Sequence, residues 1–93
     1  MAESNYTRAR KAKAHVNEAN RLGWPETKEG IKVLVLEMTA DERTVCLCGR
    51  FIKRWDGWRF QFPSTMAVIG AIENRDAQEK TAEELVFSED EEG

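Results

Sequence analysis

The side chains that could do chemistry in this chain are few, and none stands at a spacing that assembles a reactive site. His15 falls in a predicted helix, and no motif places a serine, a cysteine or a carboxylate where it could work with this imidazole as a base. Cys46 and Cys48 lack the second pair of ligands that a zinc site needs. Gly49 and Gly57 do not have the spacing of a phosphate-binding loop. We therefore expect no enzymatic activity, no metal and no cofactor.

Arginine is the residue type that could bind a partner, and its arrangement depends on a β-hairpin predicted over residues 50–62. Asp56-Gly57 is a dipeptide favoured in two-residue type I′ turns, because both central residues need positive φ and Gly adopts it without steric cost. The cross-strand pairs predicted from this turn are Trp55 with Trp58, Arg54 with Arg59, Lys53 with Phe60, Ile52 with Gln61, and Phe51 with Phe62.

Alternation along the two strands sorts these side chains onto two faces. We expect the aromatic face, which Lys53 interrupts, to be core, and the second face to be open. The predicted opposition of Arg54 and Arg59 is unfavourable, by a few tenths to about 1 kcal/mol, so a phosphate, an acidic protein, a second copy or the acidic end of the chain would compensate it. The aromatic face collects Phe51, Trp55, Trp58, Phe60 and Phe62, and the second face collects Arg50, Ile52, Arg54, Arg59 and Gln61.

The elements that position this hairpin begin with a helix from Ser4 or Asn5 to about Leu22, since Gly23 and Trp24-Pro25 end it. Its apolar stripe is made mostly of small residues at spacings of three and four, namely Ala9, Ala12, Val16 and Ala19.

Two further strands are predicted before the turn, at residues 31–38 and 43–53, with a loop at 39–42. After Pro63, Ser64 or Thr65 caps a second helix. The predicted fold is α+β, a two-layer sandwich in α-β-β-β-α order, with a three-stranded antiparallel meander and both helices on its aromatic face. Val33 and Val35 would then lie beside the arginines on the open face.

Length and charge bound the organisation of the chain. Its 93 residues predict a single domain over residues 1–87, and the net charge is −3. The last residues, 88–93, are acidic without an apolar side chain, which predicts a disordered tail. Thr81 begins a further capping box that would place Leu85 and Phe87 on the body. Without a secretory signal or a long apolar span we expect a cytoplasmic protein and no membrane contact.

The first function class is a non-enzymatic protein-binding module, an inhibitor or adaptor that acts by surface contact. It would use either the sheet face with its arginine rim or the acidic C-terminal surface. If the partner is a nucleic-acid-binding protein, the clustered carboxylates could compete with phosphate for its basic groove. In size and charge the chain resembles small inhibitors carried by bacteriophages and other mobile elements. A homodimer through the same sheet face is a further expectation. The residues expected to bind the partner are Val33, Val35, Arg50, Ile52, Arg54, Arg59 and Gln61.

The alternative is a nucleic-acid-binding domain that uses the arginine-lined sheet face and the basic first helix. The predicted α-β-β-β-α order is similar to that of double-stranded-RNA-binding domains, which implies phosphate contacts. Those domains open their last helix with a lysine cluster, whereas this chain has Pro63-Ser64-Thr65-Met66-Ala67 there. The acidic net charge also opposes attraction to phosphate, so this alternative ranks second.

Overall fold

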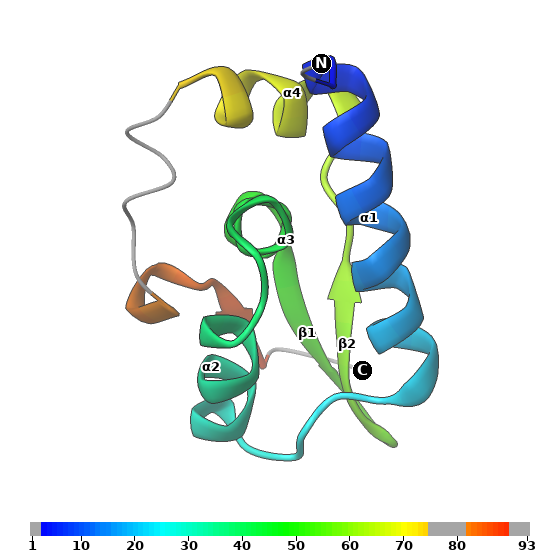
Figure 1. Ribbon diagram of the computed structural model, residues 1–93. Helices are drawn as coiled ribbons and strands as arrows, with labels where there is room; N and C mark the ends of the chain where they lie inside the picture. The colour runs from blue at the N-terminus through cyan, green and yellow to red at the C-terminus, as the bar shows by residue number, and fades with distance from the viewer. Residues whose placement is uncertain (1–2, 75–81, 90–93) are drawn as a thin grey trace.

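The computed structural model describes residues 3–74 and 82–89, which form helices packed on a small mixed sheet (Figure 1). The α+β class is confirmed, but the predicted α-β-β-β-α order is wrong because two of the predicted strand segments are helical. In chain order the elements are α1 (Asn5–Leu22), α2 (Lys28–Leu36), α3 (Ala40–Cys48), β1 (Arg50–Arg54), β2 (Gly57–Gln61), α4 (Thr65–Glu73), the 3-10 helix η2 (Ala82–Glu84) and β3 (Phe87–Ser88).

Helix α1 forms where the sequence predicts it. The Ser4 hydroxyl accepts a hydrogen bond from the Thr7 backbone N–H at 3.1 Å, which satisfies one of the free amides of the first turn. Gly23 ends the helix at a φ of +102°, a conformation that glycine adopts most readily. The small residues Ala9 and Ala12 are buried with Val16, and they let α1 pack closely on α3 and α4.

Helix α2 replaces the strand predicted at residues 31–38. The Thr27 hydroxyl accepts from the Gly30 N–H at 3.0 Å and caps the helix. Ile31 and Val35, four residues apart, are both fully buried, whereas Val33 between them is 57% exposed. A strand would put all three on one face, so the burial follows helical periodicity.

Helix α3 replaces the loop predicted at 39–42 and most of the strand predicted at 43–53. Thr39 and Glu42 form a reciprocal capping box, with both bonds at 3.3 Å. The helix then passes through the middle of the fold, where it packs on both α1 and α4 (Figure 1), and Val45 and Cys46 are buried. Only from Arg50 onward is the predicted strand confirmed, as β1.

The hairpin β1–β2 is confirmed, but its register is two residues away from the prediction. Phe51 lies opposite Phe60 and Arg54 opposite Gly57, which leaves Trp55 and Asp56 in the turn. A shift of two residues keeps every strand residue on its predicted face, because side chains alternate with a period of two. Trp55 is the exception, since it leaves the sheet and is 96% exposed rather than core.

The third strand, β3, corrects the predicted meander. It pairs with β1 in parallel, with Phe87 opposite Phe51 and Ser88 opposite Ile52, and the strand order is β2-β1-β3. The prediction that Leu85 and Phe87 pack on the body is confirmed, because Leu85 is buried and the Phe87 ring stacks on Phe51 at 5.5 Å. Ser88 therefore belongs to the sheet and not to a tail. The predicted tail beyond Glu89 and the predicted cap at Thr81 lie outside the described residues.

Helix α4 begins after the predicted cap, Ser64, whose hydroxyl accepts from the Ala67 N–H at 3.1 Å. It packs on α1 and α3 beyond the end of the sheet that is far from the hairpin turn (Figure 1). The prediction that both flanking helices lie on the aromatic face therefore fails for α4. On that face the indole of Trp24 meets Phe51 edge-on at 4.8 Å, and Val35 of α2 and Val45 of α3 belong to the same buried cluster.

Candidate functional site: an arginine face on the sheet

The structure brings five of the seven predicted partner-binding residues together and separates the other two. We call the five residues the arginine face. They alternate along β1 and β2 with the buried Phe51, Trp58 and Phe60, so they lie on the side of the sheet away from the core. Val33 and Val35 are not part of it, because they belong to α2. The arginine face consists of Arg50, Ile52, Arg54, Arg59 and Gln61.

At the centre of the arginine face is one apolar side chain surrounded by cations. Arg50 and Arg54 flank Ile52 along β1, and Arg59 lies directly opposite Ile52 on β2. The predicted opposition of Arg54 and Arg59 does not occur, since Arg54 faces Gly57. The register thus places the like charges diagonally, where their repulsion is weaker than in a directly opposed pair.

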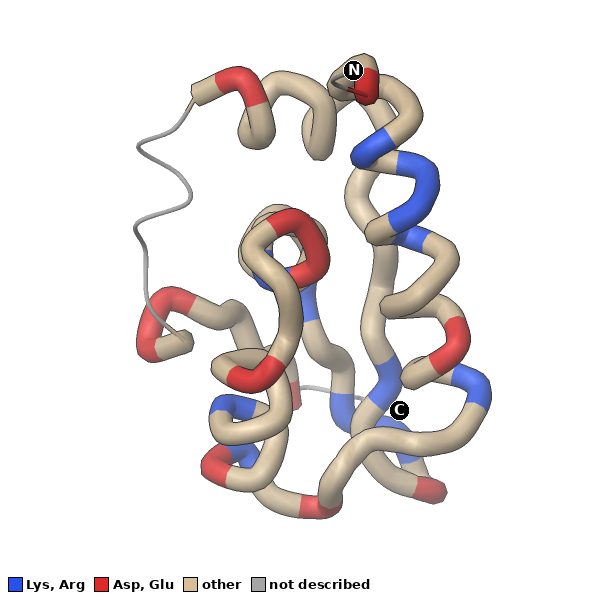
Figure 2. Tube along the Cα trace, in the orientation of Figure 1, with Lys and Arg blue, Asp and Glu red and all other residues tan. Residues whose placement is uncertain are grey.

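Two of the three arginines have no compensating carboxylate among residues 3–74 and 82–89. Arg59 donates to Asp56 at 3.4 Å, at the long end for an ion pair, and both side chains are exposed. No ion pair joins Arg50 or Arg54 to another described residue. Figure 2 shows lysine and arginine along the hairpin with one acidic residue at its turn, whereas the first turn of α3 and η2 are acidic. The arginine face is therefore a cationic surface with an apolar centre.

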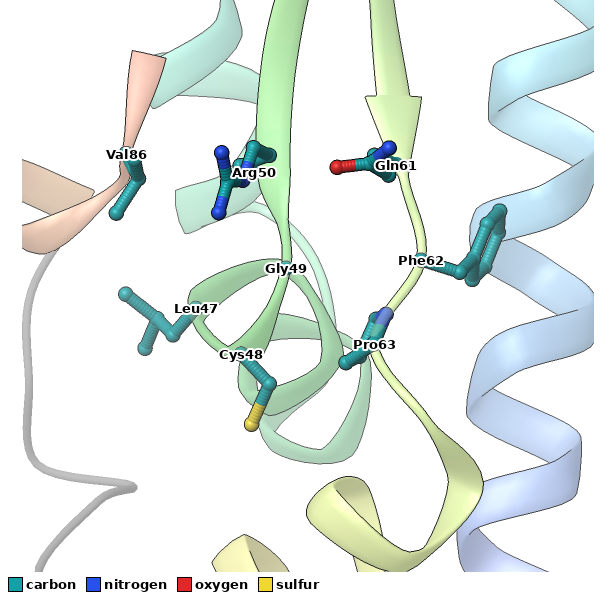
Figure 3. A pocket seen from close by; sticks show the side chains of 8 residues that line it. All are labelled: Leu47, Cys48, Gly49, Arg50, Gln61, Phe62, Pro63 and Val86. Atoms are coloured by element: carbon teal, nitrogen blue, oxygen red, sulfur yellow. The ribbon is translucent and has the colours of Figure 1, made fainter. Parts of the chain in front are cut away.

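One end of the arginine face opens into a cleft of about 290 Å³ between β3 and the strand end of β2. Figure 3 shows the Arg50 guanidinium extending toward Val86 and the Gln61 carboxamide pointing toward β1. Gly49 forms the floor between them. This volume is at the lower limit of small-molecule sites, so the cleft suits one side chain of a partner better than a cofactor.

On the side of the sheet opposite the arginine face, the end of the C-terminal strand is joined to α2. Lys28 of α2 forms an ion pair with Glu89, directly after β3. The hydrogen bond from Lys28 and the charges of Lys28 and Lys53 lower the pKa of the Glu89 carboxyl. This carboxylate therefore stays ionised near neutral pH.

Asn20 positions the sheet, and sequence reasoning missed it. Its Oδ1 accepts from the Phe60 backbone N–H at 2.9 Å and from the Trp24 indole N–H at 2.8 Å. Its Nδ2 donates to the Phe60 carbonyl at 3.3 Å. One side chain thus occupies the free edge of β2 as a neighbouring strand would. An asparagine near the end of a helix carries no sequence signal for this role.

The side chains that could take part in catalysis are one histidine and two cysteines. His15 is exposed, and its Nδ1 lies 2.7 Å from a carboxylate oxygen of Glu42. Cys46 is buried, and burial followed by the charge of Glu42 raises the pKa of its thiol to about 12. Neither cysteine is in a disulfide. The described part of the chain contains no group of three or more residues that could hold a metal ion.

Comparison with protein-family models, with curated proteins and with solved structures finds no match to this chain. None of the helices in the described ranges is long and apolar enough to cross a membrane. The interpretation of the site therefore depends on its geometry and charge.

Proposed function

We propose that this protein is a non-enzymatic, cytoplasmic protein-binding module, an inhibitor or adaptor that docks through the arginine face. The observation that carries the proposal is Ile52 surrounded by three arginines on an open sheet face, with Arg50 and Arg54 free of ion pairs to described residues. An apolar centre with a polar rim, enriched in arginine, is the composition of protein interfaces.

The charges of the surface suggest the chemistry of the partner. Guanidinium groups bind carboxylates in a planar, bidentate manner, so a partner with exposed Asp or Glu side chains would match Arg50, Arg54 and Arg59. A nucleic-acid-binding protein is one target class of this proposal, since the carboxylates at the C-terminal end of the chain could compete with phosphate for its basic groove. Self-association through the face remains a prediction that like charges oppose.

Nucleic-acid binding is the second candidate, and the same unpaired arginines favour it. This candidate also needs the basic first helix to contact phosphates, but two cations of that helix are already held in ion pairs. Arg8 is held by Asp41 at 2.7 Å, and Lys11 forms an ion pair with Glu3. In Figure 2 the basic residues of α1 lie mostly in the half near α4, whereas those of the hairpin extend to its turn. Arg21 at the C-terminal end of α1 shares a groove with Arg59, but Glu26 and Asp56 line the same groove and would repel a phosphate.

The α2–α3 pair offers no second route to nucleic acid. Three residues, 37–39, join the two helices, which is the connection length of a helix-turn-helix. In such motifs the second helix presents its first residues to the bases. Here the first turn of α3 carries Asp41 and Glu42, which face Arg8 and His15 of α1. Carboxylates in this position would repel the phosphates of a duplex.

The test captures a partner from extract of the source cells on the immobilised full chain, with and without nuclease. We expect a stoichiometric protein that survives nuclease and is lost from the Arg54→Glu/Arg59→Glu variant. The matched control reverses two charges on α1, Arg10→Glu/Lys11→Glu, and should retain the partner. Capture that nuclease abolishes, or that both double variants lose equally with a steep dependence on salt, would instead establish nucleic-acid binding.

A further inference from the structure

The most exposed large apolar side chain in the described part of the chain is the indole of Trp55. It is 96% exposed, whereas Trp24 and Trp58 are 8% and 7% exposed. Those two indoles also donate hydrogen bonds, to Asn20 at 2.8 Å and to the Glu26 carbonyl at 3.1 Å. No hydrogen bond or ring contact joins Trp55 to another described residue. A tryptophan that packs on a partner buries about 150–250 Å², which is the largest contribution a single side chain offers to an interface.

The turn presents this indole from a fixed position. Arg54 and Gly57 close the strands on either side of Trp55 and Asp56, and Gly57 has a φ of +122° that other residues rarely adopt. The base of the turn is anchored to the core, because the Trp58 indole is bonded to Glu26 and its ring contacts Phe87 at 5.3 Å. In Figure 1 the turn is at the end of the molecule opposite α4. The backbone of the turn is therefore anchored at an extremity, and the indole has only two side-chain torsions to fix on binding.

The charges around the tip favour a protein over a nucleic acid. Arg54 precedes Trp55 and Asp56 follows it, so the aromatic ring lies between opposite charges. The groove beside the turn carries both signs of charge, because Asp56 and Glu26 line it together with Arg21 and Arg59. A phosphate backbone is negative throughout, so the carboxylates of Asp56 and Glu26 would repel it. A protein surface can instead offer a carboxylate to Arg54 and neutral groups to Asp56.

We propose that Trp55 is the anchor of the interface and inserts into an apolar pocket of a protein partner whose rim carries a carboxylate facing Arg54. This inference rests on the proposed function and specifies which residue of the surface carries most of the affinity. It agrees with the enrichment of Trp and Arg among residues that dominate binding energy.

The test places the photo-crosslinking residue p-benzoylphenylalanine at position 55 of the full chain, in the source cells. The control position is Tyr6, an aromatic residue that is 54% exposed on α1. We expect a nuclease-resistant protein adduct from position 55 alone, with the crosslinked segment of the partner containing apolar residues and Asp or Glu. An adduct with nucleic acid, or adducts only from position 6, would overturn the inference.

The dissociation constant for the purified crosslinked partner gives a quantitative test. We expect Trp55→Ala to weaken binding by about 30-fold or more, the usual threshold for a dominant interface residue, and Trp55→Phe to weaken it less. The urea midpoints of both variants should equal that of the parent chain, because this side chain contacts nothing in the described fold. If Arg54→Glu/Arg59→Glu abolishes binding while Trp55→Ala does not, the anchor is wrong and the proposed function stands. If neither Arg54→Glu/Arg59→Glu nor Trp55→Ala weakens binding, the proposed function fails as well.

Two defined probes test the other uses of an exposed tryptophan. The first is a 20-residue oligothymidine and the second is vesicles of phosphatidylglycerol and phosphatidylcholine, both at low salt. We expect neither to shift the tryptophan emission of the parent chain relative to Trp55→Phe. A shift with the oligonucleotide would assign the indole to base stacking, and a blue shift with vesicles to a lipid surface, and either would overturn the inference.

Discussion

At the scale of single residues, Asn20 is the side chain whose removal should be most informative. Asn20→Ala leaves the Phe60 N–H and C=O and the Trp24 indole N–H without their partners in a partly buried location. Each unsatisfied group costs about 1 kcal/mol or more, so we expect the free energy of unfolding to fall by about 2–3 kcal/mol. Urea unfolding followed by tryptophan fluorescence measures this loss.

Two control variants of Asn20 separate the edge contact from helix effects. Asn17→Ala, at an exposed position of the same helix, should change stability by less than about 0.5 kcal/mol. Asn20→Asp can still accept both N–H bonds but cannot donate to the Phe60 carbonyl, so its stability should lie between those of the parent chain and Asn20→Ala. Equal stability of Asn20→Ala and Asn17→Ala would contradict the role assigned to Asn20.

The two cysteines should differ sharply in reactivity. Burial raises the pKa of the Cys46 thiol to about 12, from an ordinary value of 9.0, whereas Cys48 is only half-buried. The thiolate is the reactive form, so a disulfide reagent at pH 8 should label Cys48 first, and Cys48→Ser should leave only a thiol that reacts upon unfolding. Rapid labelling of two thiols in the parent chain would contradict the burial of Cys46.

The raised pKa of the Cys46 thiol also makes the free energy of unfolding depend on pH. Between pH 9 and about 12 the Cys46 thiol ionises in the unfolded chain but stays protonated in the fold. Its stabilising contribution is complete below pH 9 and is lost as the pH rises through this interval. The free energy of unfolding should therefore fall more steeply in the parent chain than in Cys46→Ala, in denaturant titrations across that range.

At the scale of elements, the sequence identified the helices at both flanks and the hairpin, but it misassigned residues 28–48. The near-continuous apolar segment 31–38, interrupted by Lys32 and Glu37, fits a buried strand and a buried helix equally well. The β-branched Val33, Val35 and Val45 favoured the strand. The deciding signals were local: Thr27 before one helix and Thr39 with Glu42 before the next. The second is a capping box whose pattern is readable in the sequence.

The hairpin register shows what local turn chemistry cannot decide. Asp56-Gly57 predicted the turn to within two residues, but the core selected the pairing in which Phe51 faces Phe60 and both rings meet Trp24. In the register that was predicted, Trp55 would have been paired on the core face, close to the turn. The arginine face was recoverable because a shift of two preserves sidedness, whereas the exposure of Trp55 depended on tertiary packing.

The junction between α3 and β1 gives a prediction at this scale. A Cβ on Gly49 would lie 2.4 Å from Cζ of Phe60 and 2.5 Å from the backbone oxygen of Gln61. Because the carbonyl cannot move without shifting β2, we expect Gly49→Ala to lower the free energy of unfolding by about 3 kcal/mol. Gly70, inside α4, has nothing within 4 Å, so Gly70→Ala should stabilise the protein by about 0.5–1 kcal/mol. Calorimetry of both variants compares them, and a neutral Gly49→Ala would refute the close approach.

At the scale of the whole molecule, contacts distant in sequence join the helices to one another and to the C-terminal segment. Asn5 of α1 donates to Glu73 of α4, and the neighbouring Arg8 donates twice to Asp41 of α3, which raises the pKa of its guanidinium. On the other side, α2 is joined to the C-terminal segment through Lys32–Glu83 and Lys28–Glu89. The lysine–carboxylate pairs reach solvent and contribute little energy individually, whereas the two-bonded Arg8–Asp41 pair is partly buried. We expect the aromatic cluster to supply most of the cohesion.

Phe87 tests that conclusion, because it connects the C-terminal segment to the core. Its ring stacks on Phe51 at 5.5 Å, meets Trp58 edge-on at 5.3 Å, and lies beneath the Lys28 ammonium at 5.7 Å. Burying a phenylalanine fully is worth about 3–5 kcal/mol against alanine, so a half-buried ring should account for about 2 kcal/mol. We expect Phe87→Ala to lose this amount in urea unfolding and to increase hydrogen exchange along β1. Val86→Ala, at the adjacent and 49% exposed position, should lose less than about 1 kcal/mol. Equal losses in the two variants would mean that β3 is held by its backbone bonds rather than by the ring, and that the core does not extend to the end of the described chain.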